Sequence, residues 1–304
     1  MSVELVAAED ALRISTNIAN GHGLPDSDLT KQVAEAAQTV SSLSGAKLRS
    51  ILEEIILGRE ASTALQWLHD AGVLAKLLPE VEATVEFVQE VGRKHKDVWE
   101  HTKQVVMQTP PEPNIRWAAL FHDVGKVPTR IIEKSGKVTF HRHAEVGARM
   151  FCGVARRLMF PKSMSEKITF LVLNHLRASQ YDETWTDSAV RRFDREMREY
   201  LPELFKLSRA DVTSARKNKC EAARQRIDEL ESRVMALRET DSHKPLLPSG
   251  LGDEIMIRFG LQPGRLVGEL KKELERAIEK NELEAQREAL YYLDYIEAHE
   301  KDRF

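Results

Sequence analysis

The chain has 304 residues, of which 42% are hydrophobic and 31% are charged. This length allows one large or two ordinary domains, and the composition excludes a disordered or membrane-embedded protein. No apolar run approaches the ~18 residues that a membrane span needs, and the N-terminus lacks a signal pattern. Two cysteines, Cys152 and Cys220, are too few for a disulfide framework. We therefore expect a cytoplasmic protein with no membrane partner.

The net charge of −3 is unevenly distributed. Residues 91–219 contain 25 Lys and Arg against 15 Asp and Glu, whereas the remainder contains 20 against 33. A basic middle in an acidic protein fits an anionic ligand bound at one place, although solvated helix faces would give the same count.

The apolar residues recur at three- and four-residue spacing along most of the chain, which is typical of amphipathic helices. One segment breaks this pattern, because residues 129–141 alternate around Ser135-Gly136 and predict a small β-hairpin. The fold class predicted is therefore all-α with one hairpin. The helical stretches expected are 48–58, 65–79, 97–107, 116–125, 144–160, 165–176, 189–200, 204–239 and 264–300.

Histidines cluster in the basic middle, where six of the ten lie between His95 and His175. The centre of the cluster is FHDVGK at 121–126, in which His122 and Asp123 follow an apolar helix. Adjacent side chains point about 100° apart on a helix, so both reach one site only if a cleft lies beside this turn.

A second His-Asp pair, His69-Asp70, has no other histidines near it in the sequence. We interpret it as part of a packing helix and not as a site.

His122 and Asp123 have further metal-ligand residue types at workable distances along the chain. Imidazoles and carboxylates from separate helices suit transition metals such as Mn, Fe, Co or Ni better than calcium. The additional residues are His101, His143, His175 and Asp211.

The order of these residues resembles the HD superfamily of metal-dependent phosphohydrolases. Three segments resemble more specifically the body of bacterial CCA-adding tRNA nucleotidyltransferases, and PLLPSGL at 245–251 with FGLQPG at 259–264 resembles their tail. The three segments are DVWEHT at 97–102, RWAALFHDVGKVPTR at 116–130 and HAEVGA at 143–148.

The resemblance implies a helical HD core with a helical C-terminal tail. It divides the chain into a helical neck and body segment (1–90), an HD phosphohydrolase domain (91–219) and a tail similar to the tRNA-binding tail of that family (220–304). EDALR at 9–13 faintly resembles the neck motif. A nucleotidyltransferase head has no counterpart, because Asp26-Ser27-Asp28 has the carboxylate spacing but lies in a loop without a preceding strand. We therefore expect no nucleotide-adding activity.

The resemblance and coordination chemistry together imply a divalent transition metal, with two ions expected. His101, His122, Asp123 and Asp211 would hold the first ion, and His143 and His175 the second. Asp123 would bridge them, since its two oxygens can each serve one cation. Two ions ~3.5–4 Å apart can activate a shared hydroxide for attack on phosphorus.

Basic residues beside the ligand segments are candidates for binding the substrate phosphate. Lys126 follows the helix end and can act as a point charge, or it can be an ordinary loop lysine. His141 can protonate a leaving oxygen or form a hydrogen bond within the hairpin. The remaining phosphate-binding candidates are Arg130, Arg142, Arg177 and Arg209.

The function expected is that of a metal-dependent phosphohydrolase acting on a nucleotide or RNA-end phosphoester, for which the resemblance implies 2′,3′-cyclic or 2′-phosphate substrates. One alternative is a tRNA-binding module with a vestigial HD site. Another is a partner of a separate nucleotidyltransferase head. Because the tail is acidic, we expect any tRNA binding to be weak, and we expect no DNA partner.

Overall fold

The computed structural model describes residues 8–36, 43–87, 97–213, 216–242 and 245–299. Helices dominate these residues, and the two short strands pair as an antiparallel hairpin with Ile131 opposite Thr139. The predicted all-α class with one hairpin is therefore confirmed. None of the described helices is both long and apolar enough to cross a membrane.

The chain divides into two compact units, residues 1–233 and residues 234–304. The expected boundary at 90/91 lies outside the described residues, and the one at 219/220 lies in the first turn of a long helix, α14. The helices of the first unit are α1 (Ala8–Ala19), α2 (Ser27–Ala36), α3 (Gly45–Leu57), α4 (Ala61–Asp70), α5 (Leu74–Leu77), α6 (Pro79–Glu82), α7 (Val98–Gln108), α8 (Pro113–Phe121), α9 (Lys126–Thr129), α10 (His143–Arg157), α11 (Lys162–Asn174), α12 (Asp187–Met197), α13 (Leu201–Asp211) and most of α14 (Lys217–Ser242), with strands β1 (Ile131–Ile132) and β2 (Val138–Thr139).

The first helices form a small bundle in which α1 packs against α3 and α4. The Asp26 side chain accepts a hydrogen bond of 2.8 Å from the Leu29 amide, so it caps the start of α2. The expectation that residues 26–28 lie in a loop was thus wrong, because Ser27 and Asp28 are the first residues of this helix.

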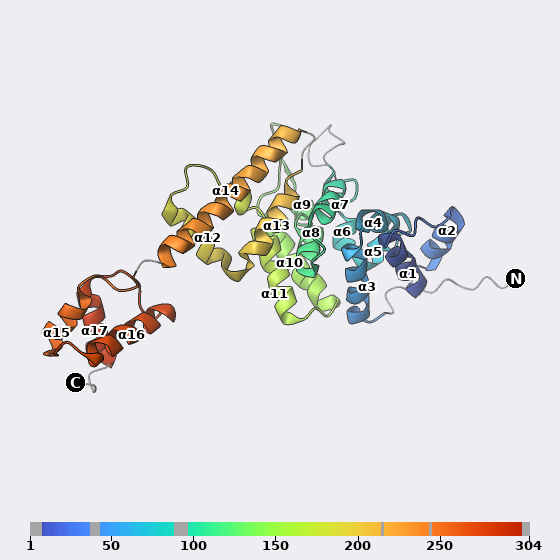
Figure 1. The fold of residues 1–304 in the computed structure, drawn as a ribbon. Helices are drawn as coiled ribbons and strands as arrows, with labels where there is room; N and C mark the ends of the chain where they lie inside the picture. Colours follow the sequence, from blue (N-terminus) through green and yellow to red (C-terminus); the bar gives the residue numbers. More distant parts are fainter. Residues whose placement is uncertain (1–7, 37–42, 88–96, 214–215, 243–244, 300–304) are drawn as a thin grey trace. The chain divides into compact units, whose positions relative to one another are not determined.

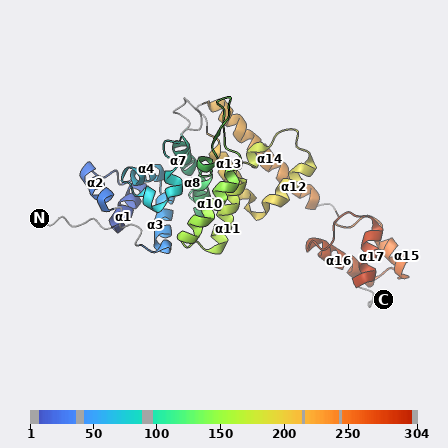
Figure 2. The ribbon, with the colours of Figure 1, turned by 180° about the vertical axis from the view of Figure 1, so that it is seen from behind.

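Five helices, α7, α8, α10, α11 and α13, pack against one another in the middle of the first unit (Figure 1; Figure 2 from behind). Their apolar faces are buried, with Trp99, Trp117 and Phe121 at most 2% exposed. Burial of such large side chains supplies most of the favourable free energy in a helical core. This core holds the helix ends that carry the candidate site.

The predicted helix over 204–239 was wrong at one point, because it ends at Asp211 and resumes at Lys217. Val212 leaves the helical conformation with φ −70° and ψ 94°. The next residue, Thr213, forms a side-chain hydrogen bond with His101 of α7. β-Branched residues have low helix propensity, and this contact from another helix favours the break.

The second unit contains α15 (Leu251–Phe259), α16 (Arg265–Glu279) and α17 (Ala289–His299) around a core that includes Leu251, Ile255 and Tyr292. The predicted helix over 264–300 was wrong in its middle, because α16 ends before Asn281, which has a φ of 62°. Beyond this turn, the Tyr292 hydroxyl donates to the Glu284 carbonyl at 2.7 Å, which links the connecting segment to α17.

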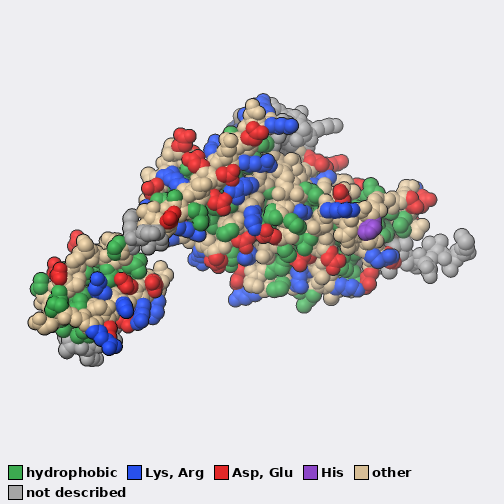
Figure 3. All heavy atoms as spheres, viewed as in Figure 1, with side chains coloured by type: hydrophobic (Ala, Val, Ile, Leu, Met, Phe, Trp, Pro, Cys, Tyr) green, Lys and Arg blue, Asp and Glu red, His purple; other side chains and the backbone are tan. Residues whose placement is uncertain are grey.

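Basic and acidic side chains alternate over the face of the first unit that Figure 3 presents. Many basic side chains of this unit pair with carboxylates, as in the ion pair of 2.7 Å between Lys167 and Glu203. The positive excess counted over residues 91–219 therefore does not appear as a continuous basic surface on this face.

Candidate metal centre

Four of the six predicted ligands lie at helix ends. His122 directly follows α8, His175 directly follows α11, and Asp211 is the last residue of α13. His143 is the first residue of α10, and only His101 lies inside a helix, α7. The packing of these helices brings the six side chains together from segments up to 110 residues apart in the sequence.

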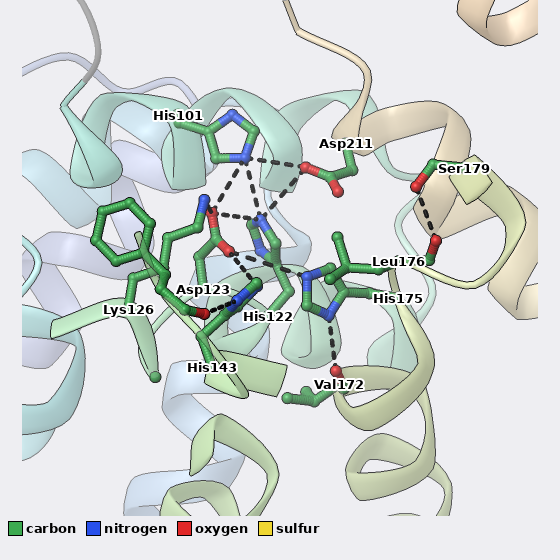
Figure 4. Close-up of polar contacts among 12 residues, drawn as sticks. His101, His122, Asp123, Lys126, His143, Val172, His175, Leu176, Ser179 and Asp211 are labelled. Atoms are coloured by element: carbon green, nitrogen blue, oxygen red, sulfur yellow. Dashed lines mark hydrogen bonds and ion pairs between the residues drawn. The ribbon is translucent and has the colours of Figure 1, made fainter. Parts of the chain in front are cut away.

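The Asp123 carboxylate lies at the centre of the site and is 2% exposed (Figure 4). Its Oδ2 atom is 3.3 Å from His122 Nε2 and 3.5 Å from His101 Nε2. Its Oδ1 atom is 3.6 Å from His143 Nε2 and 3.9 Å from His175 Nε2. Each oxygen of one carboxylate therefore faces a different pair of imidazoles.

Asp211 completes the set on the side of His101 and His122. Its Oδ1 atom is 3.0 Å from His101 Nε2 and 3.5 Å from His122 Nε2. Within each of two trios, the possible ligand atoms all lie within 4.8 Å of one another. The first trio is His101, His122 and Asp211, and the second is Asp123, His143 and His175.

Three of the histidines are oriented by backbone carbonyls. In each case Nδ1 donates to the carbonyl oxygen three residues earlier, in the last turn of a helix or at the end of the hairpin. A carbonyl only accepts, so these contacts place a proton on Nδ1, and whenever the imidazole is neutral its Nε2 lone pair faces the site. The distances are 2.7 Å from His122 to Ala119, 3.0 Å from His143 to Phe140 and 2.7 Å from His175 to Val172.

His101 is oriented by a side chain instead. Its Nδ1 atom is 2.7 Å from the hydroxyl oxygen of Thr213, two residues beyond Asp211. Thr213 was not predicted from the sequence. The only indication of its role is that a residue with a hydroxyl group follows the candidate ligand Asp211 by two positions.

The pKa of His122 shifts in the opposite direction to the pKa values of His143 and His175. Burial alone would lower the pKa of His122, but the carboxylates of Asp123 and Asp211 outweigh burial and raise it to about 10. Burial lowers the pKa of His175 to about 4 and also lowers the pKa of His143. Burial opposes ionisation of Asp123 and Asp211, but neighbouring cationic groups, His122 above all, hold both pKa values below the usual range.

The donor set fits a divalent transition metal. His143 Nε2 and His175 Nε2 are buried, aim at Asp123 and have no hydrogen-bond partner in the described part of the chain. A buried polar atom without a partner costs about 1–3 kcal/mol, and a metal ion would satisfy both nitrogens. Four imidazoles with two carboxylates suit transition metals better than calcium.

Two of the basic candidates lie near this cluster. Lys126 Nζ is 2.6 Å from Asp123 Oδ2 and lies over the Phe140 ring, 5.8 Å from its centroid. The Arg130 guanidinium lies over the Phe87 ring at 5.2 Å, and its buried Nε has no hydrogen-bond partner among the residues that the structure describes.

The other basic candidates have different surroundings. His141 and Arg142 are exposed in the turn before α10, where Arg142 lies 3.6 Å from Glu145. Arg177 pairs with Glu196 at 2.5 Å, and Arg209 pairs with Asp228 at 2.6 Å and also with Glu231. These three arginines thus already have carboxylate partners.

Comparison with known proteins identifies a domain family that matches the part of the chain with these residues. Residues 88–216 match the HD domain family, and they include all six clustered residues. The chain therefore carries an HD domain, and it resembles the body of CCA-adding enzymes.

Two relatives match most of the chain. The CC-adding tRNA nucleotidyltransferase of Thermus thermophilus is 33% identical over 255 residues, which are 82% of this chain and 56% of the relative. The A-adding tRNA nucleotidyltransferase of Deinococcus radiodurans is 32% identical over 251 residues, 80% of this chain and 56% of the relative. A multifunctional CCA protein of Pseudomonas syringae is 30% identical over 122 residues, 39% of this chain and 28% of the relative. The chain thus spans about half the length of the first two.

The turn that carries Asp123 packs closely against the backbone at the start of α10. A Cβ atom at Gly125 would lie 2.0 Å from the His143 carbonyl oxygen and 2.6 Å from the Gly147 amide nitrogen. The structure also corrects the prediction that the helix extends to Gly125, because α8 ends at Phe121 and a turn follows. Glycine at 125 thereby lets Asp123 and His143 approach each other.

We expect Gly125→Ala to destabilise the protein by about 1–3 kcal/mol, because the added methyl group overpacks a backbone contact. Urea unfolding measures this change. Gly153→Ala is the matched control, since Gly153 lies in α10 with nothing within 4 Å of its Cβ position. That variant should gain about 0.5–1 kcal/mol from helix propensity, and equal effects of the two substitutions would contradict the account.

We expect divalent metal affinity to rise with pH between 7 and 9. In the metal-free protein His122 is charged at pH 7, because its pKa is raised to about 10, and a ligating imidazole must be neutral. Release of about one proton predicts an affinity roughly tenfold higher per pH unit. Calorimetric titration with Mn²⁺ in buffers of different ionisation enthalpy measures the protons released. Affinity that does not change over this range would contradict the charged state of His122.

Proposed function

We propose that this protein is a metal-dependent phosphohydrolase that acts on a phosphoester of a nucleotide or an RNA end, with 2′,3′-cyclic and 2′-phosphates as the substrates to test first. The observation that supports this most is the geometry of Asp123, whose two oxygens face two separate pairs of imidazoles. A carboxylate in this arrangement suits bridging of two cations.

In this proposal His101, His122, Asp123 and Asp211 hold one ion, and Asp123, His143 and His175 hold the other. When bound, two such ions supply Lewis-acid activation of both the phosphoryl group and the attacking water. The carbonyl and hydroxyl partners of the Nδ1 atoms keep each imidazole in the tautomer that presents Nε2 to the ion.

Lys126 and Arg130 are the proposed phosphate-binding residues. Lys126 Nζ is anchored next to Asp123, so its charge lies where a phosphate at the metals would bind. Arg130 has no carboxylate partner among the residues described, whereas Arg142 and Arg177 each have one and Arg209 has two. His141, exposed two residues before His143, is the proposed donor of a proton to the leaving oxygen.

We expect Asp123→Ala to abolish metal-dependent hydrolysis of adenosine 2′,3′-cyclic phosphate, with a loss of at least about 10³-fold in kcat/KM, because one substitution weakens both metal sites. Removing metal from the wild type with a chelator should give the same loss, reversed by Mn²⁺.

His69→Ala is the control, since His69 also precedes an aspartate but pairs with Glu82 at 2.9 Å, away from the cluster. The His69→Ala substitution should at most lower the stability of the protein. Near-wild-type hydrolysis by a folded Asp123→Ala protein would contradict the proposed site.

A second candidate function is tRNA binding, with the HD site vestigial or in service of a separate nucleotidyltransferase. The supporting observation is that the similarity to two proteins named as tRNA nucleotidyltransferases extends over about 80% of the chain, well beyond the HD match at 88–216. In this proposal the tail, 220–304, contacts the RNA.

We expect tRNA binding to be micromolar and to depend weakly on salt. The tail is acidic, so few phosphates would be neutralised, and each contributes only ~0.7–0.9 to the slope of log affinity against log salt. A slope corresponding to about two to four contacts should appear when labelled tRNA is titrated at several salt concentrations. Nanomolar binding with a steep slope would instead make RNA binding the main function.

A further inference from the structure

Two aromatic rings and two cationic side chains form a continuous row that starts at the metal centre. Lys126 Nζ contacts Asp123 and lies 5.8 Å from the Phe140 ring centroid. The Phe140 and Phe87 centroids are 6.2 Å apart, with the rings tilted by 55°. Arg130 lies over Phe87 at 5.2 Å. Starting from Asp123, the order of contacts is therefore Lys126, Phe140, Phe87 and Arg130.

The backbone of both phenylalanines forms hydrogen bonds with the segments that carry the candidate metal ligands. The Phe140 carbonyl accepts a hydrogen bond from His143 Nδ1, so its position is tied to that imidazole. The Phe87 carbonyl accepts from the Val98 amide at 3.1 Å, and Val98 is the first residue of α7, which carries His101. The main chain at both phenylalanines is thus tied to the segments that carry His143 and His101.

The rings are half-buried, in contrast to the fully buried Trp117 and Phe121 of the core. A half-buried aromatic ring keeps part of its surface available to a ligand. Aromatic side chains and arginine planes are the surfaces on which proteins stack nucleobases, and such stacking does not require a particular base.

We propose that Phe140 and Phe87 form a nucleobase-stacking subsite next to the candidate metal centre, with Arg130 beside Phe87. The inference rests on the proposed phosphohydrolase function and deepens it, because it makes the substrate a nucleotide or RNA end instead of a simple phosphoester. A phosphate held at Lys126 would have the Phe140 ring within the length of one nucleotide. The Nε of Arg130 has no hydrogen-bond partner among the described residues, so it offers a donor for a further phosphate oxygen.

The test compares two ligands that differ in the base, AMP and ribose 5-phosphate, by calorimetry with the Mn²⁺-loaded protein. Phe140→Leu and Phe87→Leu should each weaken AMP binding about tenfold, because one stacked base contributes roughly this much. Binding of ribose 5-phosphate should stay within about twofold of the wild type. Phe87→Trp and Phe140→Trp keep a stacking surface and should retain AMP affinity.

Phe170→Leu is the matched control. Phe170 is a half-buried ring that packs against Tyr200 at 5.1 Å, and Lys167 lies over that tyrosine at 5.2 Å. This second cation–aromatic group is not part of the proposed subsite, so the substitution should leave the affinity for both ligands unchanged.

Equal weakening of AMP and ribose 5-phosphate by the leucine variants would mean that the rings have only a structural role. Wild-type protein that binds AMP no more tightly than ribose 5-phosphate would also overturn the subsite. A different result would contradict the proposed function and leave the subsite standing. In that case the wild type shows the expected preference for AMP but hydrolyses no phosphoester in the presence of Mn²⁺.

Discussion

The site depends on the burial of one carboxylate, that of Asp123, at the meeting point of several helix ends. An ionised carboxylate in the interior is costly unless cationic groups and hydrogen bonds compensate. Here His122 and Lys126 hold its pKa below the usual range and keep it charged. The short turn after α8 brings Asp123 to the first residue of α10, and only glycine at 125 allows this approach. The chain therefore holds a negative charge where two pairs of imidazoles converge.

Helix ends explain how the imidazoles converge with one orientation. The last carbonyls of a helix have no partner within the helix. His122 and His175 directly follow α8 and α11, and each donates Nδ1–H to a carbonyl of the final turn. The same hydrogen bond satisfies the backbone and directs Nε2 towards Asp123. One hydrogen bond at each helix end thus satisfies a backbone carbonyl and also orients the candidate ligand.

The six clustered residues were predictable from the sequence because their types, order and local contexts match a metal site of the HD superfamily. The hairpin was predictable because its alternation and Ser135-Gly136 turn are local signals. The break after Asp211 was not, since the apolar spacing continues through residues 204–239 while the cause is a contact with His101 in a distant helix. The row of Phe87 and Phe140 was also missed, because these rings are 53 residues apart and neither segment has a distinctive pattern.

The central claim is that Asp123 joins two metal sites into one centre. A crystal structure of the Mn²⁺-loaded protein, with anomalous difference maps collected at the manganese edge, tests it most directly. The account predicts two peaks ~3.5–4 Å apart, one beside each oxygen of Asp123, with His101 and His122 on one side and His143 and His175 on the other. A single ion away from Asp123, or ions bound elsewhere in the chain, would contradict it.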